Sequence, residues 1–226
     1  MNQTSEVAKT QVSSLETLKI RDCGFSFRGS FDGPRSLESL HATEVANAFL
    51  ETFREQNLSA ADVILDKGDS LFGYSLKAYL YGRLVSINLG AIAVEGSFLR
   101  LLSAADRHIA AECIKKVIEL FKPALSPVCF FEAAIHADFR SAKAREEFFS
   151  RHAGAGLDLG GVLGYKKVED QEFIRVSIDQ SYTYANGAFI HLSTLGMRLE
   201  RFLSSDPIWH RFFELTERFA LRLDDV

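Results

Sequence analysis

Two stretches of the chain, GYSLKAYLYGRLVSINLGAIAVEGSFLRLLS at residues 73–103 and GYKKVEDQEFIRVSIDQSYTYANGAFIHLST at residues 164–194, align without a gap at a constant offset of 91 residues. Both contain Gly-Tyr, Val-Ser-Ile and, further on, matching Gly, Phe and Leu positions. Ordinary residue frequencies would give about two identities over this length, and the alignment has more. Self-similarity at a fixed offset is the signature of an internal repeat. We therefore predict a tandem duplication.

Similar elements surround both stretches. A strand-like run comes before each of them, at residues 18–28 and 128–140. Each run is followed by an amphipathic helical pattern, near residues 40–54 in the first half and 141–152 in the second. The strand at 63–66 is the one element predicted for the first half alone.

A second helix follows each stretch. Ser103 and Asp106 form a capping box that begins a helix to about Phe121, with Ile109 among its inward residues. In the second half, Asp206 supplies an N-cap with a proline after it, and the apolar spacing predicts a C-terminal helix that reaches Leu223.

Within each stretch the pattern alternates with a period of two, which is typical of strands. Asn186-Gly187 predicts a two-residue hairpin turn with positive φ, and Glu95-Gly96 is its counterpart in the first half. Tyr81-Gly82 and Glu169-Asp170 mark the preceding turns. Each half is therefore predicted to be β-α-β-β-β-α.

These patterns predict an α+β fold built from a duplicated β-α-β-β-β-α unit, with mainly antiparallel sheet covered on one face by helices. The predicted organisation is a flexible N-terminal arm at residues 1–16, a first half at 17–125 and a second half at 126–226, joined in one pseudo-two-fold unit. In topology alone this resembles the duplicated fold of the TATA-box-binding protein, or a helix-grip fold. No sequence motif of either family is present, so the resemblance implies no function.

Composition narrows the classes of protein. The 226 residues carry 26 Lys and Arg against 30 Asp and Glu, a net charge of -4, so a nucleic-acid partner is not expected. No apolar run approaches the roughly 20 residues of a membrane span, and no membrane association is expected. Three scattered cysteines without a paired Cys or His spacing favour reduced thiols in the cytoplasm, with no metal or cofactor.

One predicted sheet face combines aromatic and cationic side chains. A turn at Asn186-Gly187 would set Tyr182 opposite His191 and Tyr184 opposite Phe189. At the same offset, Phe98 and Arg100 correspond to Phe189 and His191. Such a face could bind a partner or an anionic ligand by stacking and charge, while a core face with long side chains reaching water explains the same pattern.

Two further groups are candidate sites. His136, Asp138 and Arg140 alternate along one strand; His136 and Asp138 suit a general base with its orienting carboxylate, or two metal ligands, and a solvated strand face is the alternative. Trp209, with Phe212 and Phe213, forms an aromatic cluster that is either core packing or an interface anchor.

No arrangement of residues identifies a reaction, and we predict no catalytic residue. The first hypothesis is a non-catalytic cytoplasmic protein-binding or assembly subunit, acting with a protein partner or as a homo-oligomer. The second is a small-ligand pocket, with or without catalysis, between sheet and helices. The third is nucleic-acid binding by the sheet, which the charge disfavours.

Overall fold

The computed structural model describes residues 15–33, 42–52, 54, 63–66, 73–80, 83–90, 93–101, 103–121, 125–152, 161–169, 172–198, 200 and 208–224. In chain order the elements are β1 (Glu16–Phe31), α1 (Ala42–Thr52), β2 (Val63–Asp66), β3 (Gly73–Leu80), β4 (Arg83–Gly90), β5 (Ala93–Phe98), α2 (Ala104–Phe121), β6 (Leu125–Asp138), α3 (Ala142–His152), β7 (Val162–Glu169), β8 (Glu172–Gln180), β9 (Gly187–Leu195), β10 (Met197–Arg198), α5 (Ile208–Glu217) and β11 (Leu221–Asp224).

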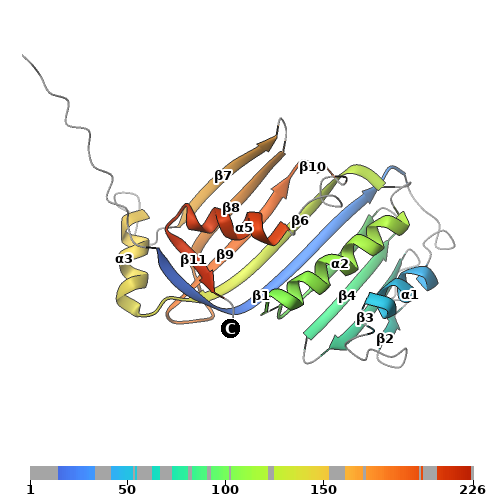
Figure 1. Cartoon of the computed structure of the whole chain (residues 1–226), viewed down its shortest axis with the longest axis horizontal. Coiled ribbons are helices and arrows are strands. Elements are labelled where there is room, and N and C mark those ends of the chain that lie inside the picture. Colours follow the sequence, from blue (N-terminus) through green and yellow to red (C-terminus); the bar gives the residue numbers. More distant parts are fainter. Residues whose placement is uncertain are drawn as a thin grey trace, which may run out of the picture.

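All the strands belong to one open sheet, ordered β2-β3-β4-β5-β1-β6-β9-β8-β7, with β10 beside β6 and β11 beside β1 (Figure 1). The long strands β1 and β6 lie at the centre, and each comes from a different half of the chain. Every pairing is antiparallel except that of β1 with β11, which is parallel. The predicted α+β class with a mainly antiparallel sheet is confirmed.

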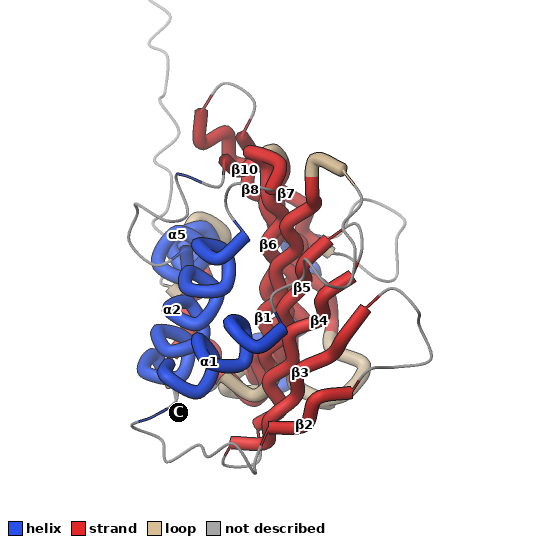
Figure 2. Tube along the Cα trace, turned by 90° about the vertical axis from the view of Figure 1, so that its right-hand side faces the viewer, coloured by secondary structure: helices blue, strands red, loops and turns tan. Residues whose placement is uncertain are grey.

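The helices α1, α2 and α5 lie on one side of the sheet (Figure 2), while α3 lies at its end, near the start of β1 (Figure 1). Alternation along the central strands explains this layering, because successive side chains of a strand point to opposite faces. On β1, Cys23, Phe25 and Phe27 are buried. Both Phe25 and Phe27 stack on Phe131 of β6. The centroid of the Phe131 ring lies 6.1 Å from that of Phe25 and 6.4 Å from that of Phe27.

Both ends of α2 are where the sequence predicts them. The Asp106 amide donates to Ser103 Oγ at 3.1 Å, and the Ser103 amide donates to Asp106 Oδ2 at 3.2 Å, so the capping box is confirmed. Ile109 is half-buried, and the buried apolar side chains in the described part of the helix are Ala110, Ala111, Ile114 and Ile118. None of the helices in the described part of the chain has the length and apolar character needed to cross a membrane.

The predicted C-terminal helix is wrong in its length. Helix α5 ends at Glu217, and Leu223 lies in strand β11. Ala220, with a φ of 59°, turns the chain out of the helix, and its amide donates to the Glu217 carbonyl at 2.9 Å. The turn lets Leu221 and Leu223 pair with β1, where both are buried. The N-cap predicted at Asp206 lies outside the described residues.

The two predicted hairpin turns are also wrong. Glu95 and Gly96 lie inside β5, paired with β1 and β4. In the second half, β8 ends at Gln180 and β9 begins at Gly187, so residues 181–186 connect them. Gly187 does not have a positive φ; Gly196 is the one described glycine that does.

This longer connection changes the register of the second half. Val85 pairs with Phe98, whereas Val176, which lies 91 residues after Val85, pairs with Leu192, 94 residues after Phe98. The second hairpin is therefore longer by three residues. An odd shift moves each side chain to the other face of the sheet, so Phe98 and Phe189 do not occupy equivalent positions.

Burial in the core raises the pKa of the Cys129 thiol from 9.0 to about 11. Between these values an unfolded chain loses the thiol proton and the folded chain keeps it, so stability falls as the pH rises. Between pH 8 and pH 10.5, we expect the native protein to lose roughly 1–2 kcal/mol more unfolding free energy than Cys129→Ala. Urea denaturation of both proteins over this pH range measures the difference, and parallel pH curves would contradict the expectation.

Candidate functional site

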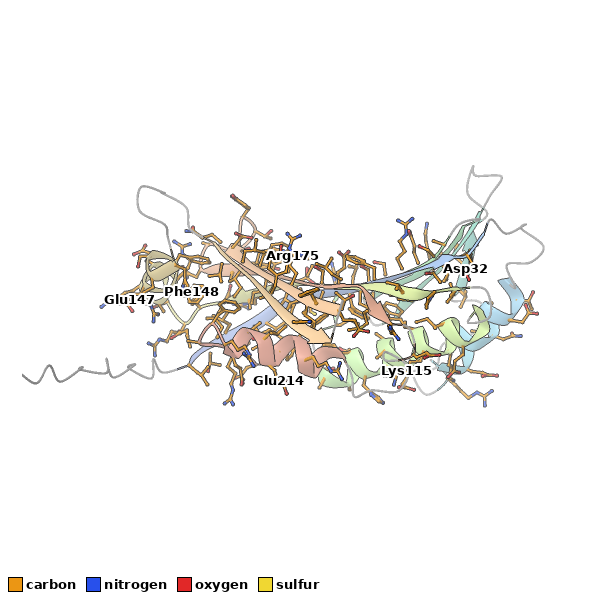
Figure 3. The ribbon with its side chains drawn as sticks, turned by 90° about the horizontal axis from the view of Figure 1, so that it is seen from above. Asp32, Lys115, Glu147, Phe148, Arg175 and Glu214 are labelled. Carbon is orange, nitrogen blue, oxygen red and sulfur yellow. The ribbon has the colours of Figure 1, made fainter. Side chains whose placement is uncertain are left out.

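The face of the sheet turned away from α1, α2 and α5 is the candidate site, and we call it the uncovered face. In Figure 3 the sheet is seen edge-on, with Arg175 of β8 on this side and Lys115 of α2 and Glu214 of α5 on the other. Gly24, Ser26 and Arg28 alternate with the buried residues of β1 and so lie on the uncovered face. When one face of an antiparallel sheet packs on the core, the other face is usually in contact with water and carries polar side chains.

The uncovered face departs from that expectation, because exposed apolar side chains gather on it. Ile64 points away from its neighbour Val63, which packs against the core, and Phe130 lies between the buried Cys129 and Phe131. The same alternation places the other exposed apolar residues of the strands on this face. Leu99, which follows β5, lies there as well, since a Cβ atom on Gly24 would be 3.1 Å from its Cδ2. None of the large exposed apolar side chains in the described residues lies on a helix. The set is Ile64, Leu99, Val128, Phe130, Leu163, Tyr165 and Leu195. The other two large exposed apolar side chains among the described residues, Leu15 before β1 and Tyr182 after β8, lie outside it.

A polar cluster lies at the centre of the uncovered face. Ser26 Oγ donates to Glu132 Oε1 at 2.8 Å, and His191 Nε2 lies 3.2 Å from Glu132 Oε2. The His191 ring is parallel to that of Phe189, with centroids 6.4 Å apart. Strands β1, β6 and β9 each supply one of the three polar residues.

The order of these contacts argues against a hydrolytic triad. In such a triad the histidine lies between the hydroxyl and the carboxylate, so that it can take the proton of the nucleophile. Here Glu132 lies between Ser26 and His191, and the serine hydroxyl donates to a carboxylate. The arrangement fixes three side chains across the central strands, which suits a rigid binding surface.

His136 does not pair with Asp138, as the proposed base and orienting carboxylate would. Its Nδ1 lies 3.0 Å from Ser181 Oγ, which also accepts the amides of Thr183 and Tyr184 at 3.2 and 3.1 Å. The His136 ring also packs on Tyr184 and Phe189, at centroid distances of 5.5 and 4.9 Å. His136 therefore anchors the connection at residues 181–186.

The other two residues of that strand pattern form separate ion pairs. Arg21 Nε donates to Asp138 Oδ2 at 2.6 Å. Arg140 lies beyond the end of β6, and its Nε is 3.3 Å from Glu16 Oε1. Within the part of the chain that the structure describes, no three His, Cys, Asp or Glu side chains are grouped to hold a metal ion.

The predicted aromatic and cationic face is wrong in its register. Phe98 is fully buried on the helix side, and Arg100 follows β5 with a φ of 60°. Phe189 pairs with Asp179, and His191 pairs with Ser177, so neither opposes a tyrosine. The structure thus leaves Phe189 and His191 together on the uncovered face and separates them from Phe98 and Arg100.

The two tyrosines lie in the connection between β8 and β9. Tyr182 is 96% exposed, and Tyr184 is half-buried against His136. The Arg145 guanidinium donates to the Ala185 carbonyl and ties this connection to α3. Trp209 lies in α5, and its side chain is outside the described residues.

Three residues of the uncovered face were not candidates from the sequence. Ser26 and its partner Glu132 are 106 residues apart in the sequence, so no local pattern could indicate that the two are in contact. Arg175 lies between Ser193 and Tyr165 in the register. Its Nε is buried with no hydrogen-bond partner among the described residues, which is an unfavourable state for a donor.

Comparison with protein-family models, with curated proteins and with solved structures found no significant match to this chain.

Proposed function

We propose that this chain is a non-catalytic protein-binding or assembly subunit that binds its partner with the uncovered face. The observation that carries the proposal is the position of the exposed apolar set, which lies on this one face in the described residues. Apolar side chains that stay exposed together mark an interaction site, and Val128 and Phe130 of β6 with Leu195 of the adjacent β9 are the members of the set on neighbouring strands. A protein with apolar side chains of its own is the partner that gains most from covering it.

The charges of the uncovered face support a protein partner over a nucleic acid. Arg21 pairs with Asp138, and Arg28 Nη1 lies 3.4 Å from Glu95 Oε1. A nucleic-acid surface needs cations that are available to phosphates, because release of counterions supplies the affinity. Here Arg21 and Arg28 already have carboxylate partners beside them, and the chain as a whole is acidic.

The small-ligand hypothesis has less support. It needs Arg100, His136, Asp138, Tyr182 and His191 to converge, because a ligand site is a concave pocket with a few polar groups directed into it. These side chains lie in different places, with Arg100 after β5 and Tyr182 in the connection between β8 and β9. Asp138 and His136 also have separate partners.

We also propose that the two halves, at residues 17–125 and 126–226, descend from one duplicated unit. Their strands follow the same order outward from the centre, β1-β5-β4-β3 and β6-β9-β8-β7. The central pair Phe25–Ala133 continues outward to Phe98 and Val85 on one side, and to Leu192 and Val176 on the other. Val85 and Val176 are equivalent at the offset of 91 seen in the sequence.

The cytoplasm fits this proposal, because Cys129 is a buried free thiol in the core. Such thiols are typical of proteins that fold in a reducing compartment. The partner is then another protein of the same compartment.

A photo-crosslinking amino acid placed at Phe130 or Leu195 tests the proposal, with His108, an exposed residue of α2, as the matched control. We expect the two sheet positions to crosslink one protein in cells and the helix position not to do so. In a titration with that purified protein, Phe130→Asp should weaken binding by roughly tenfold or more, while His108→Asp leaves it unchanged.

Urea denaturation of each variant separates a binding defect from unfolding, and Leu195→Asp provides an independent second variant. Crosslinking from His108 alone would contradict the proposal. So would an affinity that neither Phe130→Asp nor Leu195→Asp changes.

A further inference from the structure

Strand β7 is one of the two outer strands of the sheet. It pairs with β8 on one side, and no described strand pairs with its other side. An outer strand leaves a row of backbone N–H and C=O groups that can hydrogen-bond to another strand. Proteins usually protect such edges with proline, charge or a bulge.

The protection of β7 is confined to its second half. The bulge lies between Lys167 and Glu169, and Lys167 is exposed. The first half, Val162–Tyr165, has no proline or charged residue. It carries Leu163 and Tyr165, which are 58% and 59% exposed and point to the uncovered face.

We propose that β7 pairs with β7 of a second copy of this chain, antiparallel and centred on Gly164, so that the two sheets become continuous. A two-fold interface brings the same surface of both copies together and closes after two chains. The other outer strand, β2, has four residues against the eight of β7, so it does not match β7 in a head-to-tail assembly.

The Gly164-centred register is the one that pairs the apolar side chains. It sets Leu163 of each copy directly opposite Tyr165 of the other, on the same face, and such cross-strand aromatic–aliphatic pairs stabilise a sheet. Lys167 then lies opposite Gly161, so the lysines of the two copies do not face each other. A register shifted by two residues sets Tyr165 opposite Tyr165 and Leu163 opposite Lys167, or Leu163 opposite Leu163 and Tyr165 opposite Gly161, so that one apolar pair replaces two.

The side of Gly164 toward the helices is occupied within its own chain. A Cβ atom at this position would lie 2.6 Å from Phe219 Cζ and 3.4 Å from Val176 Cγ1. The contact of Phe219 with the strand backbone supports β7 on the helix side. The edge and the uncovered face of β7 therefore remain for the second copy.

The first test is the oligomeric state of the full chain, measured by analytical ultracentrifugation in a concentration series that reaches the millimolar range. We expect a monomer–dimer equilibrium, because pairing along one strand gives an interface at the small end of the known range. A chain that stays monomeric throughout the series would overturn the proposal, and so would open-ended growth beyond a dimer.

Charge substitutions on β7 test which strand forms the dimer. The double variant L163E/Y165E places like charges opposite each other, and we expect its dimer dissociation constant to rise by about tenfold or more. The variant L163K/Y165K should behave in the same way, and mixing the two should restore a dimer. Ile64→Glu on β2 is the matched control and should leave dimerisation unchanged.

Engineered cysteines test the register. Directly opposed residues of paired strands are close enough for a disulfide, whereas diagonal pairs lie about 7–8 Å apart between Cβ atoms. We expect a mixture of Leu163→Cys and Tyr165→Cys chains to crosslink under oxidation, and either variant alone not to do so. Crosslinking of one variant alone, or dissociation by Ile64→Glu, would overturn the proposal. Leu163, Tyr165 and Ile64 also belong to the exposed apolar set. Partner binding is therefore measured for each variant beside its dimerisation, with Phe130→Asp as the variant that should weaken partner binding and leave the dimer intact.

Discussion

Replacing Phe131 with alanine is expected to lower the free energy of unfolding by about 3–5 kcal/mol, the range for a fully buried aromatic residue. Phe131 has no exposed surface and lies at the centre of the sheet. Its ring stacks on Phe25 and Phe27, with interplanar angles of 12° and 24°. Because these two residues belong to β1, the substitution removes apolar contact between the halves of the chain. Urea denaturation measures the loss.

The neighbouring residue Phe130 provides a matched control. It belongs to the same strand but points to the uncovered face, where it is 37% exposed. We expect Phe130→Ala to lower the free energy of unfolding by about 1 kcal/mol, because a partly exposed ring has less buried apolar area to lose. Equal losses from the two substitutions would contradict the assignment of the buried and uncovered faces.

Replacing Gly187 with alanine is expected to cost about 1–3 kcal/mol, the usual range for overpacking a filled position. A Cβ atom there would lie 2.9 Å from both Ser181 Cβ and Tyr184 Cβ, and 3.1 Å from the Tyr184 carbonyl oxygen. These atoms belong to the backbone or lie next to it, so they cannot move without opening the connection at residues 181–186. We expect faster amide hydrogen exchange in that connection as well.

The control for Gly187 is Gly33, where a Cβ atom would meet nothing within 4 Å. Gly33→Ala should change the free energy of unfolding by less than about 0.5 kcal/mol. If Gly187→Ala is equally silent, in both stability and hydrogen exchange, close packing of the connection is not what requires a glycine at position 187.

The order and type of most elements could be predicted because they depend on local signals. Strand β2 at Val63–Asp66 and helix α3 at Ala142–His152 follow from alternation and helical spacing within a few residues. The capping box at Ser103 and Asp106 is likewise local. The end of α5 could not be predicted, because the apolar spacing that continues to Leu223 fits a helix and also the buried side of a short strand.

The candidate site depended on register, which the sequence does not specify. The alignment at an offset of 91 placed Phe98 and Phe189 on one face, but three additional residues in the second hairpin move Phe189 to the other. Ser26 and Glu132 come together only when β1 pairs with β6. The exposed apolar set could not be recognised for the same reason. The sequence pattern of a strand does not show whether a given leucine points to the buried face or to the uncovered face.

The pairing of β1 with both β6 and β11 also has a consequence for biosynthesis. On the ribosome β1 emerges before both of these partners, because residues 125–138 and 221–224 are translated much later than residues 16–31. Contacts between residues so distant in the chain form slowly, because loop closure must come before them. The nascent strand therefore keeps Phe25 and Phe27 without their partner Phe131 during much of translation. Exposed apolar strands of this kind bind chaperones or aggregate, so β1 stays unprotected until β6 and then β11 have been made and have paired with it.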